Sequence, residues 1–335
     1  MTNEKTEHPE VDEDRGEIWD SKTDRLRELI LTYQQRFNFD ISVTCTKPDK
    51  RQSFSWNGDV IRPAASLIKL YIFGAVMKRI TDGDIDRDDL FTMRSSNHVE
   101  GSGLLKYMAP PIELKLDELI YLMMAYSDNI AANMIIDIVS IDEIQKFILE
   151  TGAKNTQMLV PMMASPSQRE HGENNVTTTN DVTRIYESMS SGLSVEDHSQ
   201  DTSKWASECQ YILTASRGTA QEKLKFMVSH LNWKGLQRVL RRNLSLVPRY
   251  LKVALAIGSR KRLTANLPNQ VVTASKPGTG KTVFHDSCLL KIEISEIILA
   301  VMISCGKANF AKPQTEEYKG ACDFCAKLSQ IVVED

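Results

Sequence analysis

A serine and a lysine stand three residues apart in Ser66-Leu-Ile-Lys69, where a stretch with helical apolar periodicity begins. On a helix this spacing puts the hydroxyl and the amine on one face, within reach of each other. A serine is a weak nucleophile without a base, and a desolvated lysine can lose its proton and act as that base. The pattern indicates acyl transfer through Ser66. The alternative is a capping serine followed by a surface lysine.

Two further polar segments border apolar stretches downstream. Tyr126-Ser-Asp-Asn129 separates two apolar helical runs, and Lys276-Pro-Gly-Thr-Gly280 follows an expected strand that ends at Ser275. Taken singly, the first is explained by helix capping and the second by a turn at the end of a strand. Brought together with Ser66 they would supply a second hydroxyl and a second cation, and two neighbouring lysines lower each other's pKa.

In this order the three segments resemble the S-x-x-K, S-D-N and K-T-G motifs of class A β-lactamases and penicillin-binding proteins. The resemblance covers most of the chain. It extends to segments that lie between the motifs, namely Gly101-Ser-Gly-Leu104, the run from Asn174 to Asp181, Arg262-Leu263 and Leu267-Pro268. The chain is therefore similar to the class A-type serine hydrolases.

This resemblance implies four catalytic residues. Ser66 would be the acylated nucleophile, and Lys69 its general base or proton relay. Ser127 would stand on the opposite wall and pass a proton to the leaving nitrogen. Lys276, on an edge strand, would attract the substrate carboxylate and tune Ser127.

Three substrate-binding residues are implied in the same way. Asn129 would hydrogen-bond the amide side chain of the substrate, and Gly278 and Thr279 would border it. The oxyanion hole would consist of the backbone N–H groups of Ser66 and Thr279.

Two features depart from the family pattern. Pro277 stands where the third motif normally has a hydroxyl residue, and it offers neither a hydroxyl nor an N–H. The Glu-Pro-Glu-Leu-Asn-like run that activates water in class A enzymes is missing from residues 159–173. Glu170 and Glu173 are the candidate deacylation bases there, and the alternative is that both are ordinary surface acids. His171 is no better as a candidate base. Without such a base the acyl-enzyme persists.

The sequence thus predicts a serine hydrolase that acts through an acyl-enzyme at Ser66, with β-lactam amide hydrolysis as the first hypothesis. A D-Ala carboxypeptidase of the penicillin-binding type, or an esterase, is the alternative on the same fold. A third hypothesis is a catalytically weak protein that binds a partner or a membrane surface through the basic segment 234–262. In that segment the alternative is that apolar side chains face the core while Arg and Lys are solvated.

The expected ligand is a small β-lactam or a related amide or ester, with no cofactor. Cys322-x-x-Cys325 has no second pair or nearby histidine to complete a zinc site, so reduced thiols are expected. The run 278–282 ends like a phosphate-binding loop, but Ser275 stands where that loop needs its first glycine. No metal site is predicted.

The three motifs are positioned by helices and strands, and the predicted secondary structure differs from one part of the chain to the next. Apolar spacing predicts helices over 19–37 and 315–332, strands near 41–45, 54–56, 270–275, 289–294 and 297–304, and mainly helices from 66 to about 190. Strands at both ends with helices between them indicate an α+β fold, in which an antiparallel sheet is built from both termini and has flanking helices. A helical lobe is inserted into it, and the cleft between the lobes is the expected site.

This plan predicts three regions. Residues 1–18 form a disordered acidic tail, 19–62 and 263–335 an α/β lobe, and 63–262 a helical lobe with an atypical basic segment at about 199–262. Lys plus Arg total 41 against 44 Asp plus Glu, a net charge of -3 that gives no reason to expect nucleic acid. No secretory signal pattern or membrane-length apolar run is present, so we expect a cytoplasmic protein that does not span a membrane.

Overall fold

The computed structural model describes residues 17–168, 174–191, 262–267, 272–292 and 295–334. Its central element is a five-stranded antiparallel sheet with the strand order β2-β1-β9-β8-β7. The strands are β1 (Asp40–Lys47), β2 (Gln52–Trp56), β7 (Val272–Thr279), β8 (Val283–Ile292) and β9 (Ser295–Ser304). The predicted α+β class, with a sheet assembled from both ends of the chain, is confirmed.

The central strand β9 shows why its sequence is an almost unbroken apolar run. Successive side chains of a strand point to opposite faces. Leu299 and Val301 pack with the helices on one face, whereas Ala300 and Met302 belong to the core of the helical lobe on the other. Both faces of the sheet are therefore buried, which removes the polar alternation of a one-sided strand.

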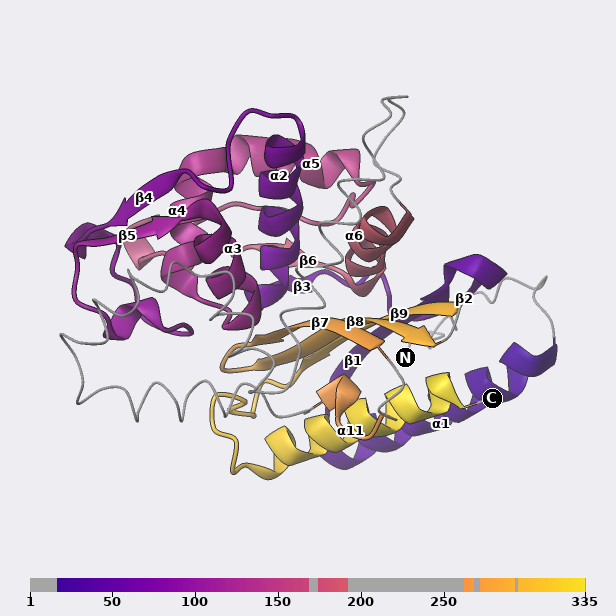
Figure 1. Cartoon of the computed structure of the whole chain (residues 1–335). Helices are drawn as coiled ribbons and strands as arrows, with labels where there is room; N and C mark the ends of the chain where they lie inside the picture. The colour runs from indigo at the N-terminus through magenta and orange to yellow at the C-terminus, as the bar shows by residue number, and fades with distance from the viewer. Residues whose placement is uncertain (1–16, 169–173, 192–261, 268–271, 293–294, 335) are drawn as a thin grey trace, which may run out of the picture.

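Two helices from the ends of the chain cover one face of the sheet. α1 (Glu17–Phe37) and α11 (Glu316–Val333) lie side by side beneath it (Figure 1). Tyr33 and Phe324 join them, with ring centroids 5.3 Å apart. Because α1 begins at Glu17, residues 17 and 18 of the expected acidic tail are helical, whereas residues 1–16 lie outside the described part of the chain, so the tail itself stays a prediction.

The helical lobe covers the other face (Figure 1). Its helices are α2 (Lys69–Thr81), α3 (Leu116–Ala125), α4 (Asn129–Val139), α5 (Ile141–Glu150) and α6 (Thr179–Ser191). Two short antiparallel pairs accompany them, β3 (Arg62–Pro63) with β6 (Val176–Thr177) and β4 (Leu90–Met93) with β5 (Ile112–Lys115). α2 is buried from Lys69 to Met77, which explains its apolar character on most sides.

The helices within the described ranges are all too short or too polar to cross a membrane. The basic segment 199–262 lies outside these ranges except for Arg262, so the membrane-surface hypothesis stays a prediction.

Candidate active site

Ser66 lies on a short 3-10 turn, η2 (Ala65–Ile68), which leads directly into α2. The preceding Ala65 has φ 46°, a left-handed conformation that costs an L-residue about 1–2 kcal/mol. Upstream, the backbone N–H of Ala64 donates to the Asn175 carbonyl over 2.7 Å. Ser66 is therefore presented on a tightly constrained corner, as strained positions at functional sites often are.

Lys69 is fully buried, so the surface-lysine alternative is wrong. Its Nζ lies 3.4 Å from Ser66 Oγ and donates to the Ser127 carbonyl over 2.5 Å and to Asn129 Oδ1 over 2.7 Å. Burial lowers the pKa of the Lys69 amine to about 7, against the opposing attraction of the Asp128 carboxylate. A substantial fraction of this amine is neutral at physiological pH and can accept a proton.

The hydroxyl of Ser127 lies between the two lysines. Its Oγ is 3.2 Å from Lys69 Nζ and 3.0 Å from the Nζ of Lys276, which is also fully buried. Ser127 has φ 53°, so the corner between α3 and α4, like Ala65 before the nucleophile, holds a non-glycine residue in the left-handed region. The amino groups of two lysines and the hydroxyls of two serines thus meet at one place.

Helix capping accounts for Asp128 but not for its neighbours. The Asp128 carboxylate caps α4 by accepting from Ile130 N and Ala131 N. It also accepts from Leu104 N and Leu105 N, at 2.6 and 2.9 Å. This buried carboxylate therefore fixes the 101–105 loop beside the second motif.

Asn129 uses its side chain within the protein. Oδ1 accepts from Lys69, and Nδ2 donates to the Glu100 carbonyl over 3.0 Å. An Asn amide nitrogen has two hydrogens, so one N–H is left for a substrate carbonyl. The predicted contact of Asn129 with a substrate amide stays a prediction, and its contact with Lys69 is an additional role.

The third motif forms part of strand β7, at the edge of the sheet, so the strand-end turn alternative is wrong. A Cβ built on Gly278 would lie 3.3 Å from the backbone nitrogen of Ser66, which means that the strand runs directly against the nucleophile. Thr279, the next residue, is exposed. Pro277 suits an edge strand because it lacks an N–H, and its carbonyl accepts from Lys276 Nζ over 3.1 Å.

Arg262 is a site residue whose contacts the sequence did not reveal, because it follows a long run of basic residues. Its Nη2 donates to Thr279 Oγ1 over 2.6 Å, and its Nη1 donates to the His285 carbonyl, also over 2.6 Å. The guanidinium carbon lies 4.0 Å above the centroid of the Phe284 ring. Arg262 therefore adds a fixed positive charge at the end of β7.

His285 connects the same strands to the segment before the nucleophile. It lies opposite Gly278 in the sheet, and its Nε2 is 2.9 Å from the Pro63 carbonyl oxygen. Burial lowers the pKa of His285 to about 4, so the ring is neutral at physiological pH. A neutral ring with its proton on Nε2 donates to Pro63 and helps to fix the nucleophile against β7.

A loop between α5 and β6 lies next to α4 and is held by three side-chain amides. Gln145 accepts from Met158 N over 2.8 Å, and Asn175 accepts from Leu159 N, also over 2.8 Å. Asn133 accepts from Met162 N over 2.7 Å, and its Nδ2 donates to the Met162 carbonyl over 3.0 Å. The backbone of residues 158–162 is thus fixed at several successive positions.

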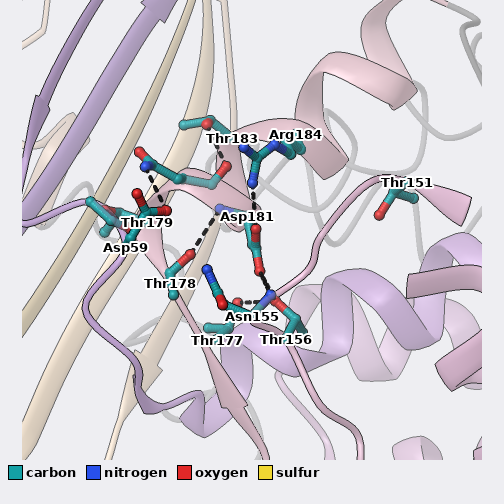
Figure 2. A network of polar contacts seen from close by, with 12 residues as sticks. Asp59, Thr151, Asn155, Thr156, Thr177, Thr178, Thr179, Asp181, Thr183 and Arg184 are labelled. Atoms are coloured by element: carbon teal, nitrogen blue, oxygen red, sulfur yellow. Dashed lines mark hydrogen bonds and ion pairs between the residues drawn. The ribbon is translucent and has the colours of Figure 1, made fainter. Parts of the chain in front are cut away.

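The beginning of that loop is anchored on Asp181 of α6 (Figure 2). The buried carboxylate accepts from Asn155 N at 2.8 Å, from Thr156 Oγ1 at 2.9 Å and from Arg184 Nη1 at 2.6 Å. Thr156 Oγ1 also contacts the hydroxyl of Tyr71 on α2 at 3.3 Å. The loop and the nucleophile's helix therefore share one buried polar network.

The candidate deacylation bases are not placed by the structure. Glu170, His171 and Glu173 lie outside the described residues. On the described part of this loop, Asn133 of α4 holds the backbone of Met162. Asn133 follows Asn129 by one helical turn, so both side chains lie on the same face of α4. A thioether cannot take a proton from water.

Among the described residues, no group of three or more His, Cys, Asp or Glu side chains is arranged to hold a metal. Cys322 and Cys325 both lie on α11, one turn apart. Burial raises the pKa of the Cys325 thiol, which disfavours the reactive thiolate.

Comparison with known proteins gave a family and a set of similar structures. The profile of the Beta-lactamase2 family, described as the beta-lactamase enzyme family, matches residues 22–204. No curated protein sequence matched the chain.

Solved structures matched over nearly the whole chain. A β-lactamase from Sphaerobacter thermophilus has a TM-score of 0.69 and 17% identity, over 92% of this chain and 95% of the other. PBP-A has a TM-score of 0.66 and 19% identity, over 92% and 94%. A class A β-lactamase representative from Bacteroides cellulosilyticus has a TM-score of 0.66 and 16% identity, over 93% and 96%. At these identities the likeness shows the fold.

Proposed function

Because the chain belongs to the beta-lactamase enzyme family, we propose that it is a serine hydrolase that forms an acyl-enzyme at Ser66. The motif resemblance to the class A-type hydrolases is confirmed by that membership and by the fold. The observation that carries the proposal is the fully buried Lys69 amine, which has a pKa of about 7 and contacts the hydroxyls of both Ser66 and Ser127.

Acylation begins with transfer of the Ser66 hydroxyl proton to the neutral Lys69 amine. Ser66 Oγ forms a bond to the carbonyl carbon of the substrate, and the carbonyl oxygen becomes an oxyanion. The N–H groups of Ser66 and Thr279 stabilise that charge, since β7 runs directly against the Ser66 backbone. Fixed donors of this kind contribute about a hundredfold or more to such a step.

The leaving nitrogen is protonated from the other side of the site. When the C–N bond breaks, the Ser127 hydroxyl gives its proton to the nitrogen, and the Lys69 ammonium returns a proton to Ser127 over 3.2 Å. Lys276, 3.0 Å from Ser127 Oγ, stabilises negative charge that develops on this oxygen. The proton taken from Ser66 thus reaches the amine through two contacts.

The substrate carries an anionic group on the leaving-group side of the scissile bond, attached to the carbon next to the leaving nitrogen. Lys276 donates to the Pro277 carbonyl on β7, and Arg262 donates to the hydroxyl of the exposed Thr279 at the end of that strand. A carboxylate is the group that an Arg fork and a neighbouring lysine recognise best. A β-lactam or a peptide with a free carboxylate fits this chemistry.

The lifetime of the acyl-enzyme separates the first function from a second candidate. With Met162 fixed by Asn133, the described part of the loop supplies no base for water, which favours a penicillin-binding protein that keeps its acyl group. A mutant of PBP-A has been solved as an acyl-enzyme complex with penicillin G. Rapid turnover instead requires a base from elsewhere, for which Glu170 and Glu173 are the candidates.

The test is the intact mass of the protein over time after penicillin G is added, with Ser66→Ala as the control. An adduct that requires Ser66 supports the proposal, and its lifetime assigns the protein to a β-lactamase or to a penicillin-binding type. If no acyl donor, including D-Ala-terminated peptides and simple esters, labels Ser66, the hydrolase proposal is wrong and the binding-protein hypothesis takes its place.

A further inference from the structure

Asp286 is a buried acid that the proposed acylation does not use. It lies on β8 opposite Pro277 of the third motif, and it is only 2% exposed. Alternate side chains of a strand share a face, and Phe284 and Cys288, two positions away on either side, belong to the core that the sheet forms with α1 and α11. A carboxylate in that apolar layer is costly unless it is hydrogen-bonded. The partners of Asp286 therefore define its role.

The carboxylate holds the backbone of the turn that carries Arg262. Asp286 Oδ2 accepts from Leu263 N over 3.2 Å, and Oδ1 accepts from Ser287 N over 3.0 Å. Leu263 is fully buried in the 3-10 turn η7 (Arg262–Thr264), which packs against α11. Arg262 itself has φ 69°, a left-handed conformation that persists only where the surrounding structure imposes it. The bond from Asp286 fixes the residue directly after that strained position.

Three successive residues of β8 act on Arg262, each through a different contact. The guanidinium carbon lies 4.0 Å above the centroid of the Phe284 ring, and Nη1 donates to the His285 carbonyl over 2.6 Å. Asp286 holds the backbone of the residue that follows. One strand therefore sets both the point from which the arginine side chain starts and the direction in which it lies. Its Nη2 then reaches the hydroxyl of the exposed Thr279 over 2.6 Å, at the end of β7.

We propose that Asp286 is a positioning residue, which holds η7 so that the Arg262 guanidinium meets the carboxylate of the substrate beside Thr279. The inference rests on the proposed function, because it assigns recognition of that carboxylate to Arg262. Without Asp286 the buried N–H of Leu263 loses its acceptor, and the left-handed Arg262 is free to relax. A guanidinium binds a carboxylate through hydrogen bonds of defined direction. The loss should therefore concern substrates that carry the carboxylate and spare those that lack it.

The test compares the second-order acylation rates of penicillin G and of its methyl ester, in which the carboxylate is neutral, using the full chain. The variants are Asp286→Ala, Asp286→Asn, Arg262→Ala and the double variant of the two alanines. Glu118→Ala is the matched control, because Glu118 is also a buried carboxylate that accepts a backbone N–H, from Lys115 over 3.0 Å at the start of α3. Thermal unfolding checks that each variant is folded.

The quantity to follow is the rate for penicillin G divided by the rate for the ester. It should fall about tenfold or more in Asp286→Ala and in Arg262→Ala, as for the loss of one hydrogen bond between charged groups. Asp286→Asn should lower it by a smaller factor, because its amide nitrogen would face one of the two N–H groups. The double variant should be no lower than Arg262→Ala alone, since effects that act through one residue are not additive. Glu118→Ala should keep the native ratio.

Three results would overturn the inference while the Ser66 adduct still forms. They are a native ratio in folded Asp286→Ala, additive losses in the double variant, and a native ratio in Arg262→Ala. If Asp286→Ala does not fold, a native ratio in Asp286→Asn has the same meaning. The absence of any adduct in the native protein, with either compound, overturns the proposed function, and this inference with it.

Discussion

The Nζ of Lys69 donates to Oδ1 of Asn129 over 2.7 Å, and this bond joins the first motif to the second. An uncharged amide oxygen satisfies the buried amine without adding a negative charge that would hold its proton. An acid in the place of Asn129 would raise the pKa of Lys69 and remove the base. The pairing explains how a buried lysine is both bonded and able to accept a proton.

The pH dependence of acylation should follow Lys69. Because burial lowers the pKa of its amine to about 7, the neutral base is lost as the pH falls through 7. We expect the second-order rate of acylation to fall about tenfold per pH unit below that value and to be level above it. The measurement is the rate of penicillin G adduct formation between pH 5 and 9. A rate that does not change between pH 5 and 8 would remove Lys69 as the base.

Gly278→Ala should impair acylation more than stability. The new methyl group would lie 3.3 Å from Ser66 N, where it crowds the space of the oxyanion. We expect a loss of about a hundredfold in acylation rate, as for the loss of one oxyanion donor. Gly306→Ala is the matched control, because a Cβ there meets no atom within 4 Å. Equal rates in the two variants would contradict the placing of β7 against the nucleophile.

Asp128→Ala should destabilise the protein strongly. The carboxylate accepts four backbone N–H groups in a buried position, two from α4 and two from the 101–105 loop. Leaving these donors unpaired should lower the free energy of unfolding by about 3 kcal/mol or more. Urea unfolding measures the change. Asp128→Asn, which keeps one acceptor oxygen, should lose less, and an alanine variant as stable as the native protein would refute this role.

Met162→Glu should shorten the life of the acyl-enzyme. Asn133 fixes the backbone of this residue beside the face of α4 that carries Asn129, so a carboxylate there can accept a proton from water. We expect a loss of adduct mass at least ten times faster than in the native protein, by general-base catalysis. Met162→Gln has the same shape without the base. If the Gln variant deacylates as fast as the Glu variant, the effect is not base catalysis.

The sequence by itself determined the spacing of the three motifs and the order of the elements. The relation of Ser66 to Lys69 is local, because a three-residue spacing on a helical turn fixes which side chains can meet. The unbroken apolar run of β9 and the apolar runs of α2 to α4 also indicated their elements, since an element that is buried on most sides carries few polar residues. For this reason the α+β class and the central sheet were predicted correctly.

Only the tertiary structure decided which distant residues meet. Ser127 and Lys276 are 149 residues apart, and their contact exists because β7 packs against the corner between α3 and α4. The bonds of Arg262 to Thr279 and of Asn133 to Met162 have no local signal either. Spacing constrains neighbours along the chain, whereas contacts between elements depend on how the sheet and the helical lobe bury their apolar faces together.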